Sequence, residues 1–532
     1  MGQGKTADRI IKMGNKKAEF GVKQTSINMI TQVISFVVNM LIGFFLTPYI
    51  VENIQSGNGF ITLSSNFISY ATLITTAVNS MAGRFIAVSY YKKDTENVLK
   101  YYSSVFFANV FLCFVLTVPL ILFLAFMPSL IDVPENLVGD VRTLFILVFS
   151  HFFVDLIFST FTSSGYVVNR LDMVAMKKTE ATILKGVLTF AIFSIFLPKL
   201  WYVGVVQLLC SFYNAFRNYR IHKTLMPEIK ISRKHFDIHK VAELVSSGIW
   251  NTISSVGSIL VNSLDVLIVN VAINAEAMDI VSVAKYIPIY VQSIIVTLSN
   301  VFAPKQTKHF AENDFEGMKK TLLSSSRIVA FITCIPVVFM AVYGKNFFQL
   351  WIPSKDAHVL WILSIVAVAP YPIQLVASAY NSIISSANKV KINSLVTIGF
   401  SVLSLAVMFI LLKLIDDTLI KMCVIVGCSM AFLTLQSLVF IVPYSTRIIH
   451  CKPLKFYFVF VQSIVCVGAS TILCYLVSKV FIANSWLKLI ASGIITCIIS
   501  AIVGFIIILG KSEKTKFIKF IKTKLLKKKE NN

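Results

Sequence analysis

Charged residues are scarce in this sequence, and the chain has no long polar stretch. Only 14% of the 532 residues are Asp, Glu, Lys or Arg, whereas 56% are hydrophobic, and the mean hydropathy is +0.78. Soluble domains carry about 25% charged residues, so this composition excludes a soluble domain. The apolar residues must instead form many segments long enough to cross a bilayer. The chain is therefore predicted to be an all-α polytopic membrane protein.

The sequence also lacks the motifs of metal sites, disulfide frameworks and nucleotide binding. Its nine cysteines are scattered without a CxxC pair, and its seven histidines form no cluster with metal-ligand spacing. The opening MGQGKT ends like a phosphate-binding loop, but it lacks the first glycine and the preceding strand. We therefore expect no metal, no cofactor and no catalytic residue, as in a transporter rather than an enzyme.

Apolar segments of about 20 or more residues follow one another along the whole chain, and we count fourteen of them. They lie near 25–48, 59–83, 102–127, 138–164, 177–197, 201–217, 242–272, 279–303, 322–343, 357–386, 391–412, 419–443, 456–479 and 486–509. The two tails and the loops after segments 2, 4, 6, 8, 10 and 12 hold about 39 of the 49 Lys and Arg residues. Cytoplasmic loops are enriched in this way, so both termini are predicted to be cytoplasmic. The net charge of +24 is thus a topology signal and does not indicate nucleic-acid binding.

The two halves of the chain repeat a pattern of polar residues. Residues 28–39 match 251–262 at an offset of about 223, and residues 62–94 match 282–314 at about 220. Because both copies enter from the cytoplasm, they predict two parallel, pseudo-symmetric six-helix lobes. The predicted organisation is a cytoplasmic basic tail (1–24), an N-lobe (25–218), a cytoplasmic linker (219–241), a C-lobe (242–444), two added helices (456–509) and a basic amphipathic cytoplasmic tail (510–532).

Polar side chains follow one face of the first two segments of each lobe. Ser, Thr and Asn in membrane helices also hydrogen-bond between packed helices, so any single residue fits packing as well as ligand binding. Their concentration on four segments favours a water-filled cavity between the lobes. The candidate substrate-binding residues on these faces are Asn28, Gln32, Ser35, Asn39, Asn66, Tyr70, Asn79, Asn251, Ser255, Asn262 and Tyr290.

Four charged side chains fall inside or at the edge of apolar segments, where an unpaired charge is costly. Asp265 and Lys285 lie at similar distances on either side of the hairpin at 274–275. Asp155 and Lys185 are placed in the same way about the hairpin between their segments. The two residues of each pair should therefore lie at similar depth in the membrane. Ion pairing is the simplest interpretation of both pairs. We take Asp155 and Lys185 to be a structural ion pair.

Asp265 and Lys285 allow a functional interpretation as well, because the corresponding N-lobe positions, 42 and 65, are uncharged. Lys285 is a candidate ligand for a phosphate, and Asp265 is a candidate site for a sodium ion or a proton. Arg84 is a second candidate phosphate contact, or a residue that reaches to lipid headgroups. Prolines inside the segments mark hinges or static kinks; they are Pro288, Pro336, Pro370 and Pro372.

Two stretches carry a resemblance to a known family, FGVKQTSINMITQVISFVVNMLIGFFLTPYIV from residue 20 and NSMAGRFIAVSYYKKD from residue 79. With the two predicted lobes, they resemble the polysaccharide-transporter or oligosaccharidyl-lipid flippase branch (O-antigen flippase-like) of the multidrug/oligosaccharidyl-lipid/polysaccharide exporter superfamily. The resemblance implies the fold of multidrug and toxin extrusion (MATE) transporters. It also implies translocation of a prenyl-pyrophosphate-linked oligosaccharide to the outer face of the cell (inner) membrane, for O-antigen, capsule or teichoic-acid-like polymers.

The resemblance implies several further features. The two added helices resemble those that form a groove for the prenyl tail in lipid II flippases. A sodium site between the seventh and eleventh helices of those flippases would correspond to Asp265 with Asn393 and Thr397, so transport is expected to be coupled to Na⁺ or H⁺, or to be uncoupled. The expected partners are the lipid-linked oligosaccharide, membrane lipids and polymerases or glycosyltransferases of the same pathway, with the protein itself a monomer.

Two alternatives compete with the flippase. A MATE-type cation antiporter driven by H⁺ or Na⁺ needs an acidic cavity, yet residues 25–48 and 59–83 contain no acid. A membrane-bound polymerase or ligase for the same glycans would need large outer loops, whereas those of this chain are short. The flippase is therefore the favoured prediction.

Overall fold

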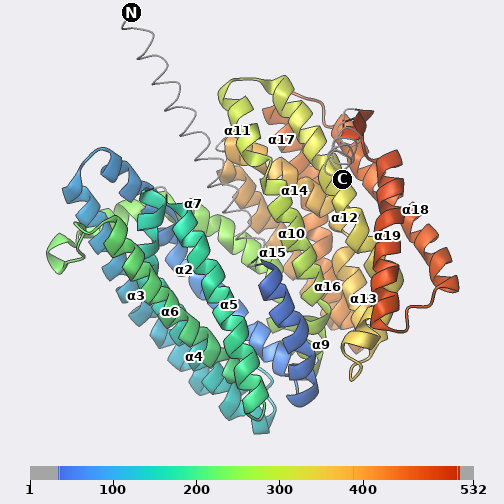
Figure 1. Cartoon of the computed structure of the whole chain (residues 1–532), viewed down its shortest axis with the longest axis horizontal. Helices are drawn as coiled ribbons and strands as arrows, with labels where there is room; N and C mark the ends of the chain where they lie inside the picture. Colours follow the sequence, from blue (N-terminus) through green and yellow to red (C-terminus); the bar gives the residue numbers. More distant parts are fainter. Residues whose placement is uncertain (1–33, 35, 169, 388, 512, 516–532) are drawn as a thin grey trace, which may run out of the picture. The chain divides into compact units, whose positions relative to one another are not determined.

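The computed structural model describes residues 34, 36–168, 170–387, 389–511 and 513–515. Within these residues the chain forms helices joined by turns and contains no β-strand (Figure 1). It divides into two compact units, unit 1 up to Thr252 and unit 2 from Ile253. The predicted all-α fold is confirmed.

Most of the predicted membrane spans are present as long apolar helices. Among the described residues, eleven helices are long and apolar enough to cross a bilayer, or twelve if the bent pair α7–α8 counts as one span. The eleven are Phe36–Asn53, Gly57–Tyr91, Thr95–Leu130, Glu135–Val167, Ala275–Ser299, Phe315–Trp351, Ala357–Ser386, Val390–Leu414, Thr418–Ile448, Leu454–Val480 and Trp486–Ile507. The protein is therefore a multi-pass membrane protein.

Counting helices by length and apolar composition gives fewer than the predicted fourteen spans, because two helices of unit 1 are too polar. α5 (Leu171–Ile195) carries at least three charged residues in every stretch of 18. α6 (Tyr202–Leu225) is made less apolar by Gln207, Asn214 and Arg217. Both are helices at the predicted positions, so the count of fourteen stays a prediction.

Unit 1 is built on the contact between α4 and α6. α4 also packs on α2 and α3, and α5 packs mainly on α6. The turn before α2 is tight, since Ser56 adopts a left-handed φ of 54° and a Cβ on Gly57 would lie 2.9 Å from Ile50. The remaining bounds in this unit are α2 (Gly57–Tyr91), α3 (Thr95–Leu130) and α4 (Val138–Val167).

The segment 219–241, predicted as a linker, is docked on unit 1. The backbone N–H of Asp237 donates to Ser104 Oγ at 3.0 Å. Leu244, in the first turns of α7 (Ile238–Asn262), is buried in the core that α2 and α3 form. The division between the units falls inside α7, after Thr252, and the predicted start of the C-lobe at residue 242 also lies inside this helix.

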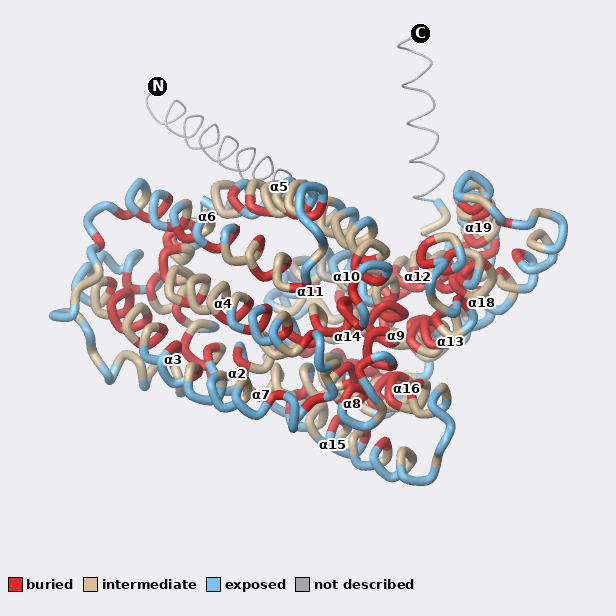
Figure 2. The backbone as a smooth tube through the Cα atoms, turned by 90° about the horizontal axis from the view of Figure 1, so that it is seen from below, coloured by how far each residue is buried: buried red, intermediate tan, exposed pale blue. Residues whose placement is uncertain are grey.

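Unit 2 is built around α12, which packs against α13, α14, α18 and α19. Figure 2 shows buried residues gathered on α9, α13, α14 and α16. The bounds in this unit are α8 (Asp265–Ala272), α9 (Ala275–Ala284), α10 (Tyr286–Asn300), α11 (Ala303–Ala311), α12 (Phe315–Trp351), α13 (Ala357–Val368), α14 (Tyr371–Ser386), α15 (Val390–Leu414), α16 (Thr418–Gln436), a π-helical turn (Ser437–Ile441), α17 (Val442–Ile448), α18 (Leu454–Val480) and α19 (Trp486–Ile507).

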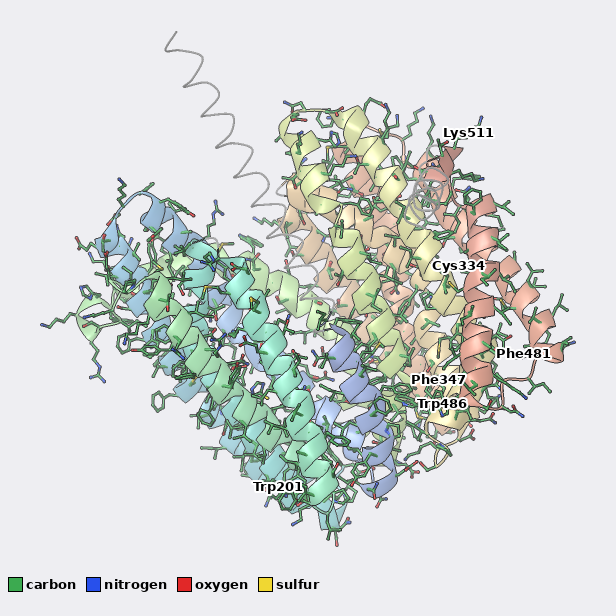
Figure 3. The ribbon with its side chains drawn as sticks, in the orientation of Figure 1. Trp201, Cys334, Phe347, Phe481, Trp486 and Lys511 are labelled. Carbon is green, nitrogen blue, oxygen red and sulfur yellow. The ribbon has the colours of Figure 1, made fainter. Side chains whose placement is uncertain are left out.

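The two added helices, α18 and α19, turn their polar residues inward. Ser492, Thr496 and Ser500 of α19 are fully buried. The opposite face exposes isoleucines four residues apart, at 490, 494, 498, 502 and 506. Trp486 at the start of α19 lies against Phe347 of α12, with ring centroids 6.3 Å apart (Figure 3). An apolar outer face with small polar residues at the helix interface is the pattern of lipid-facing membrane helices.

The same turn occurs in both units at the predicted repeat positions Asp94 and Asp314. Each caps the helix that follows, α3 or α12, by accepting the backbone N–H three residues on, at 3.1 and 2.8 Å. The residue before each has a left-handed φ, of 60° and 54°. Hydrogen bonds from the Asn97 side chain and backbone lower the pKa of Asp94, and the Gly317 backbone N–H lowers that of Asp314.

Candidate functional site

One bent helix pair and a one-residue irregularity in the next span bring Asp265 and Lys285 together in unit 2. α7 ends at Asn262 and α8 begins at Asp265, with the two axes bent by 45°. The next span is interrupted at Lys285, between α9 and α10. Lys285 Nζ donates to Asp265 Oδ2, and only 6% and 2% of the two side chains are exposed. Each charged residue thus lies at a helix break, buried against its partner.

The break at Lys285 follows from Pro288. Proline has no N–H, so Ala284, four residues earlier, loses the donor for its carbonyl. Ser364 Oγ of α13 supplies that donor at 2.6 Å, and Tyr371 Oη of α14 donates to Pro288 O at 3.0 Å. Hydrogen bonds from neighbouring helices are what make a broken helix tolerable inside a membrane.

Asp265 is favoured by its position at the first turn of α8. Its Oδ1 accepts the N–H of Val266 at 2.9 Å. A carboxylate near a helix N-terminus is stabilised by the helix dipole. With Lys285 on its other oxygen, the carboxylate is neutralised from two directions, and the buried pair carries no net charge.

The predicted ion site is not assembled around Asp265. Thr397 of α15 lies beside Gly257, and eight residues of α7 and the bend, about 12 Å of helix, separate Gly257 from Asp265. The Thr397 hydroxyl accepts from Gln436 Nε2 at 2.7 Å, and Asn393 precedes it by one turn. Within the described residues no group of three or more His, Cys, Asp or Glu side chains could hold a metal ion.

Several predicted substrate residues are held by their neighbours. Asn79 and Asn109 exchange amide hydrogen bonds of 2.9 and 3.1 Å between α2 and α3. Tyr290 Oη accepts from Tyr286 Oη at 3.3 Å. The Tyr70 ring lies 5.3 Å from that of Phe67. Asn79 in particular acts as a link between helices in this structure.

The other predicted substrate-binding residues differ in how far they are buried. Asn39, Asn66, Asn251 and Ser255 are half-buried, and Arg84 is exposed on α2. The described residues do not include Asn28, Gln32 and Ser35. The side chain of Asn262 also lies outside them. The convergence of the four polar faces on one cavity stays a prediction.

Asp155 does not form an ion pair with Lys185 in the structure. Its partner is His151, one turn earlier on α4, whose Nδ1 lies 3.6 Å from Asp155 Oδ2. His151 Nδ1 also contacts the Ser211 hydroxyl of α6. The neighbour one turn away on the same helix is the closer partner of Asp155, although His151 and Lys185 line the same cleft.

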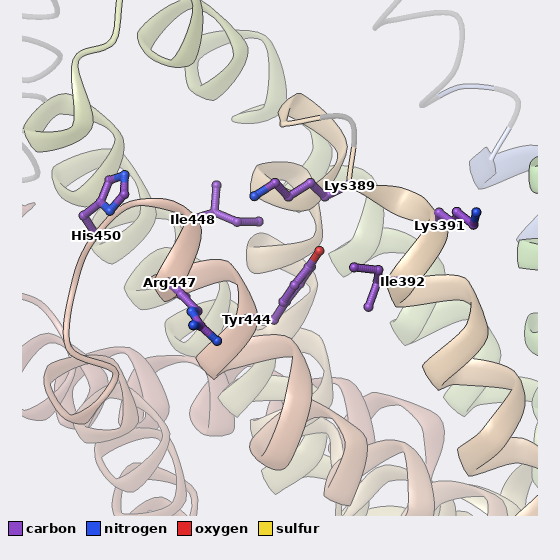
Figure 4. A pocket seen from close by; sticks show the side chains of 7 residues that line it. All are labelled: Lys389, Lys391, Ile392, Tyr444, Arg447, Ile448 and His450. Carbon is purple, nitrogen blue, oxygen red and sulfur yellow. The ribbon is translucent and has the colours of Figure 1, made fainter.

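Two basic pockets were not predicted. In unit 2, a cavity of about 620 Å³ lies between the start of α15 and α17 (Figure 4). Its basic lining residues are Lys389, Lys391, Arg447 and His450. In unit 1, a cleft of about 420 Å³ is lined by three lysines of α5. The signal for the second was available, because Lys177, Lys178 and Lys185 share one helix face in an otherwise largely apolar segment.

Comparison with known proteins agrees with this architecture. Residues 91–355 match a family model described as "Polysaccharide biosynthesis protein". An uncharacterized membrane protein of Bacillus subtilis (strain 168), EpsK, is 23% identical over 511 residues, which cover 94% of this chain and 98% of EpsK. The B. subtilis protein therefore matches along nearly its whole length.

Two solved structures share the fold. The lipid II flippase MurJ in an inward closed conformation superposes with a TM-score of 0.67 at 14% identity, covering 90% of this chain and 98% of MurJ. An inward-facing multidrug-resistance MATE transporter gives a TM-score of 0.62 at 12% identity, covering 79% of this chain and 98% of the transporter. The MATE-like fold is thereby confirmed, in a chain that is similar to polysaccharide biosynthesis proteins over residues 91–355 and to EpsK along nearly its whole length.

Proposed function

We propose that the protein translocates a prenyl-(pyro)phosphate-linked oligosaccharide across the cell membrane, from the cytoplasmic to the outer face, for assembly of a surface polysaccharide. Both termini lie in the cytoplasm, and the protein works as a monomer by alternating access. Polymerases and glycosyltransferases of the same pathway act before and after it. The observation that carries the proposal is the match to a polysaccharide biosynthesis family on a fold shared with a lipid II flippase.

The chemistry of such a cargo suits the side chains of this chain. The saccharide has many hydroxyl groups, which neutral Ser, Asn and Tyr side chains bind without a charge penalty. The phosphates need cations, and the prenyl tail can stay in lipid. The half-buried polar residues of α2 and α7, Asn66, Asn251 and Ser255, would supply the first kind of contact.

The Asp265–Lys285 pair would couple transport to an ion. While the pair is closed, Lys285 is bound to Asp265 and cannot hold a phosphate. A proton or a sodium ion on Asp265 would cancel the attraction and release the lysine. The bend between α7 and α8 lies directly before Asp265, and helix breaks of this kind line binding sites in other transporters.

A cation antiporter of the same fold fits less well. Such a protein needs a free carboxylate to attract its substrate, whereas the carboxylate of Asp265 is already paired with a lysine. Asp155, the acid of α4, contacts His151. The flippase therefore remains the better match to the charges of the spans.

The test is mass spectrometry of prenyl-linked saccharides in cells with and without the gene, with the surface glycan quantified from the same cultures. We expect a completed lipid-linked repeat to accumulate while the surface polymer is lost. Re-expression of the wild-type chain should reverse both changes. Unchanged saccharide pools with altered resistance to cationic drugs would reject the flippase and support the antiporter.

A further inference from the structure

The unused basic residues of unit 1 gather in one cleft. α2 and α5 form its walls through residues such as Ser65 and Lys185, and α4 and α6 contribute residues such as His151 and Asn214. The cleft measures about 420 Å³. Three ammonium groups and one imidazole line it, and no carboxylate is among its lining residues. A concave site of this kind inside a membrane protein has an excess of positive charge.

The lysines of the cleft are incompletely satisfied. Lys177 donates to Asn218 Oδ1 at 2.7 Å. Lys178 and Lys185 make no hydrogen bond or ion pair with any residue that the structure describes. Lys178 is exposed and Lys185 is half-buried, and a buried charge ordinarily has a partner or serves a substrate pathway, because burying it alone is expensive.

The two nearby acids contact residues other than Lys178 and Lys185, although one of these residues, His151, lines the cleft. Asp155 contacts His151 at 3.6 Å. Glu180, on α5 itself, lies 2.9 Å from Arg217 Nη2 and accepts from Tyr213 Oη at 2.7 Å. Neither carboxylate is therefore a direct partner of Lys178 or Lys185. An anionic ligand in the cleft would supply these two lysines with a counter-charge.

A diphosphate would offer these cations two neighbouring anionic groups. Lys177 and Lys185 are eight residues apart, about 12 Å along the axis of α5, and Lys178 stands beside the first. Two neighbouring phosphates can each meet an ammonium group, and charge-assisted bonds of this type are the strong ones. Neutral donors and acceptors for the adjoining sugar also line the cleft; they are Ser65, Thr182, Gln207 and Asn214.

We propose that the α5 cleft of unit 1 binds the diphosphate of the cargo, with Lys178 and Lys185 as its principal ligands. The proposal rests on the proposed function for the identity of the cargo. It moves the phosphate contact from Lys285, which is paired with Asp265, to lysines without a partner acid. The same chemistry could be met by the phosphate of a membrane lipid, so the experiment must separate the two.

Binding of radiolabelled farnesyl diphosphate to the purified full-length protein tests the proposal. We expect Lys178→Gln and Lys185→Gln each to weaken binding about tenfold or more, the loss of one charge-assisted contact. Lys199→Gln is the matched control, because Lys199 is exposed in the loop after α5. It should leave binding unchanged. Lys185→Arg, which keeps the charge, should retain more binding than Lys185→Gln, and thermal melting of each variant checks its folding.

Competition identifies the ligand. Farnesyl monophosphate should compete more weakly than farnesyl diphosphate, and phosphatidylglycerol should not compete. Equal affinity of folded Lys185→Gln and wild type would overturn the proposal. So would phosphatidylglycerol that competes as well as the diphosphate, which would make the cleft a headgroup site. The binding assay does not depend on export. A negative binding result would therefore not affect the saccharide-accumulation test of the flippase, and a negative accumulation result would not affect the binding result.

Discussion

At the residue scale, the properties of Asp265 and Lys285 depend on each other. Removing one member of a buried ion pair leaves the other charge without compensation, which costs about 3–5 kcal/mol. Replacing both by neutral side chains removes the charges together and is much less costly. Stability and transport can therefore be separated at this site.

We predict that Lys285→Met and Asp265→Asn each lower the melting temperature, and that the double variant recovers most of the loss while staying inactive in export. The neutral pair packs, but it can neither bind an ion nor release a cation. Melting of the purified variants and surface-glycan levels in cells are the two measurements. Lys345→Met, at an exposed position of α12, is the control. A double variant as unstable as the singles, or one with full export, contradicts the prediction.

Sequence patterns predicted the depth of charged residues but not their direction. Asp265 and Lys285 lie in one hairpin, where similar depth is enough to bring them into contact. Asp155 and Lys185 have similar depth on α4 and α5, yet His151 occupies the place beside Asp155. Asn79 belongs to a polar face, but which neighbour that face meets is set by packing in three dimensions.

At the scale of elements, the break between α9 and α10 depends on an exchange of hydrogen-bond donors. Pro288 removes the N–H that would serve the Ala284 carbonyl, and Ser364 replaces it. We predict that Ser364→Ala destabilises the protein by about 1–3 kcal/mol, the cost of a buried unpaired acceptor. The combined Pro288→Ala/Ser364→Ala variant should regain part of that loss, because an alanine at position 288 has an N–H that can donate to the Ala284 carbonyl.

The measurement is a double-mutant cycle of melting temperatures. The Pro288→Ala single variant provides the fourth corner of the cycle. Additive effects of the two substitutions would show that the hydroxyl does not stand in for the missing N–H. Export should fall in both variants that lack Pro288, since a continuous helix moves Lys285 away from the break.

The breaks themselves could not be read from hydropathy. The segments 242–272 and 279–303 are continuous apolar runs, and only the structure divides them at Asp265 and Lys285. Pro288 was a candidate for a kink, but Pro336 was as well, and Pro336 lies inside the unbroken α12. Proline breaks a helix where neighbours can satisfy the freed carbonyl, and those neighbours are distant in sequence.

At the scale of the whole molecule, the added helices α18 and α19 are joined to the α12 core. A Cβ on Gly504 would lie 2.7 Å from the Phe331 ring, whereas no atom lies within 4 Å of one on Gly468. We predict that Gly504→Leu lowers stability by about 1–3 kcal/mol through overpacking. Gly468→Leu on α18 is the matched control and should be neutral. Melting curves of the two variants show whether α18 and α19 are fixed on α12 or loosely attached to it. Equal melting temperatures of the two variants would indicate loose attachment.

The overall fold was predictable because bilayer thickness imposes segment length and backbone hydrogen bonding imposes helices. The repeat was visible in Asp94 and Asp314, which cap equivalent helices. The exact number of spans was harder to predict, since the lysines of α5 that lower its hydropathy are the ones that line the cleft. Charged residues within a span therefore reduce the hydropathy by which the span is recognised.

The position of the Asp265–Lys285 pair within one hairpin has a consequence for biogenesis. The two residues are only 20 positions apart, so both leave the ribosome before most of unit 2 is made. Neither has to wait for a distant helix to neutralise it. We expect these two charges to be paired already when the hairpin enters the bilayer, whereas Asp279 of the same hairpin meets its partner Lys355, 3.3 Å away, only after later helices are made.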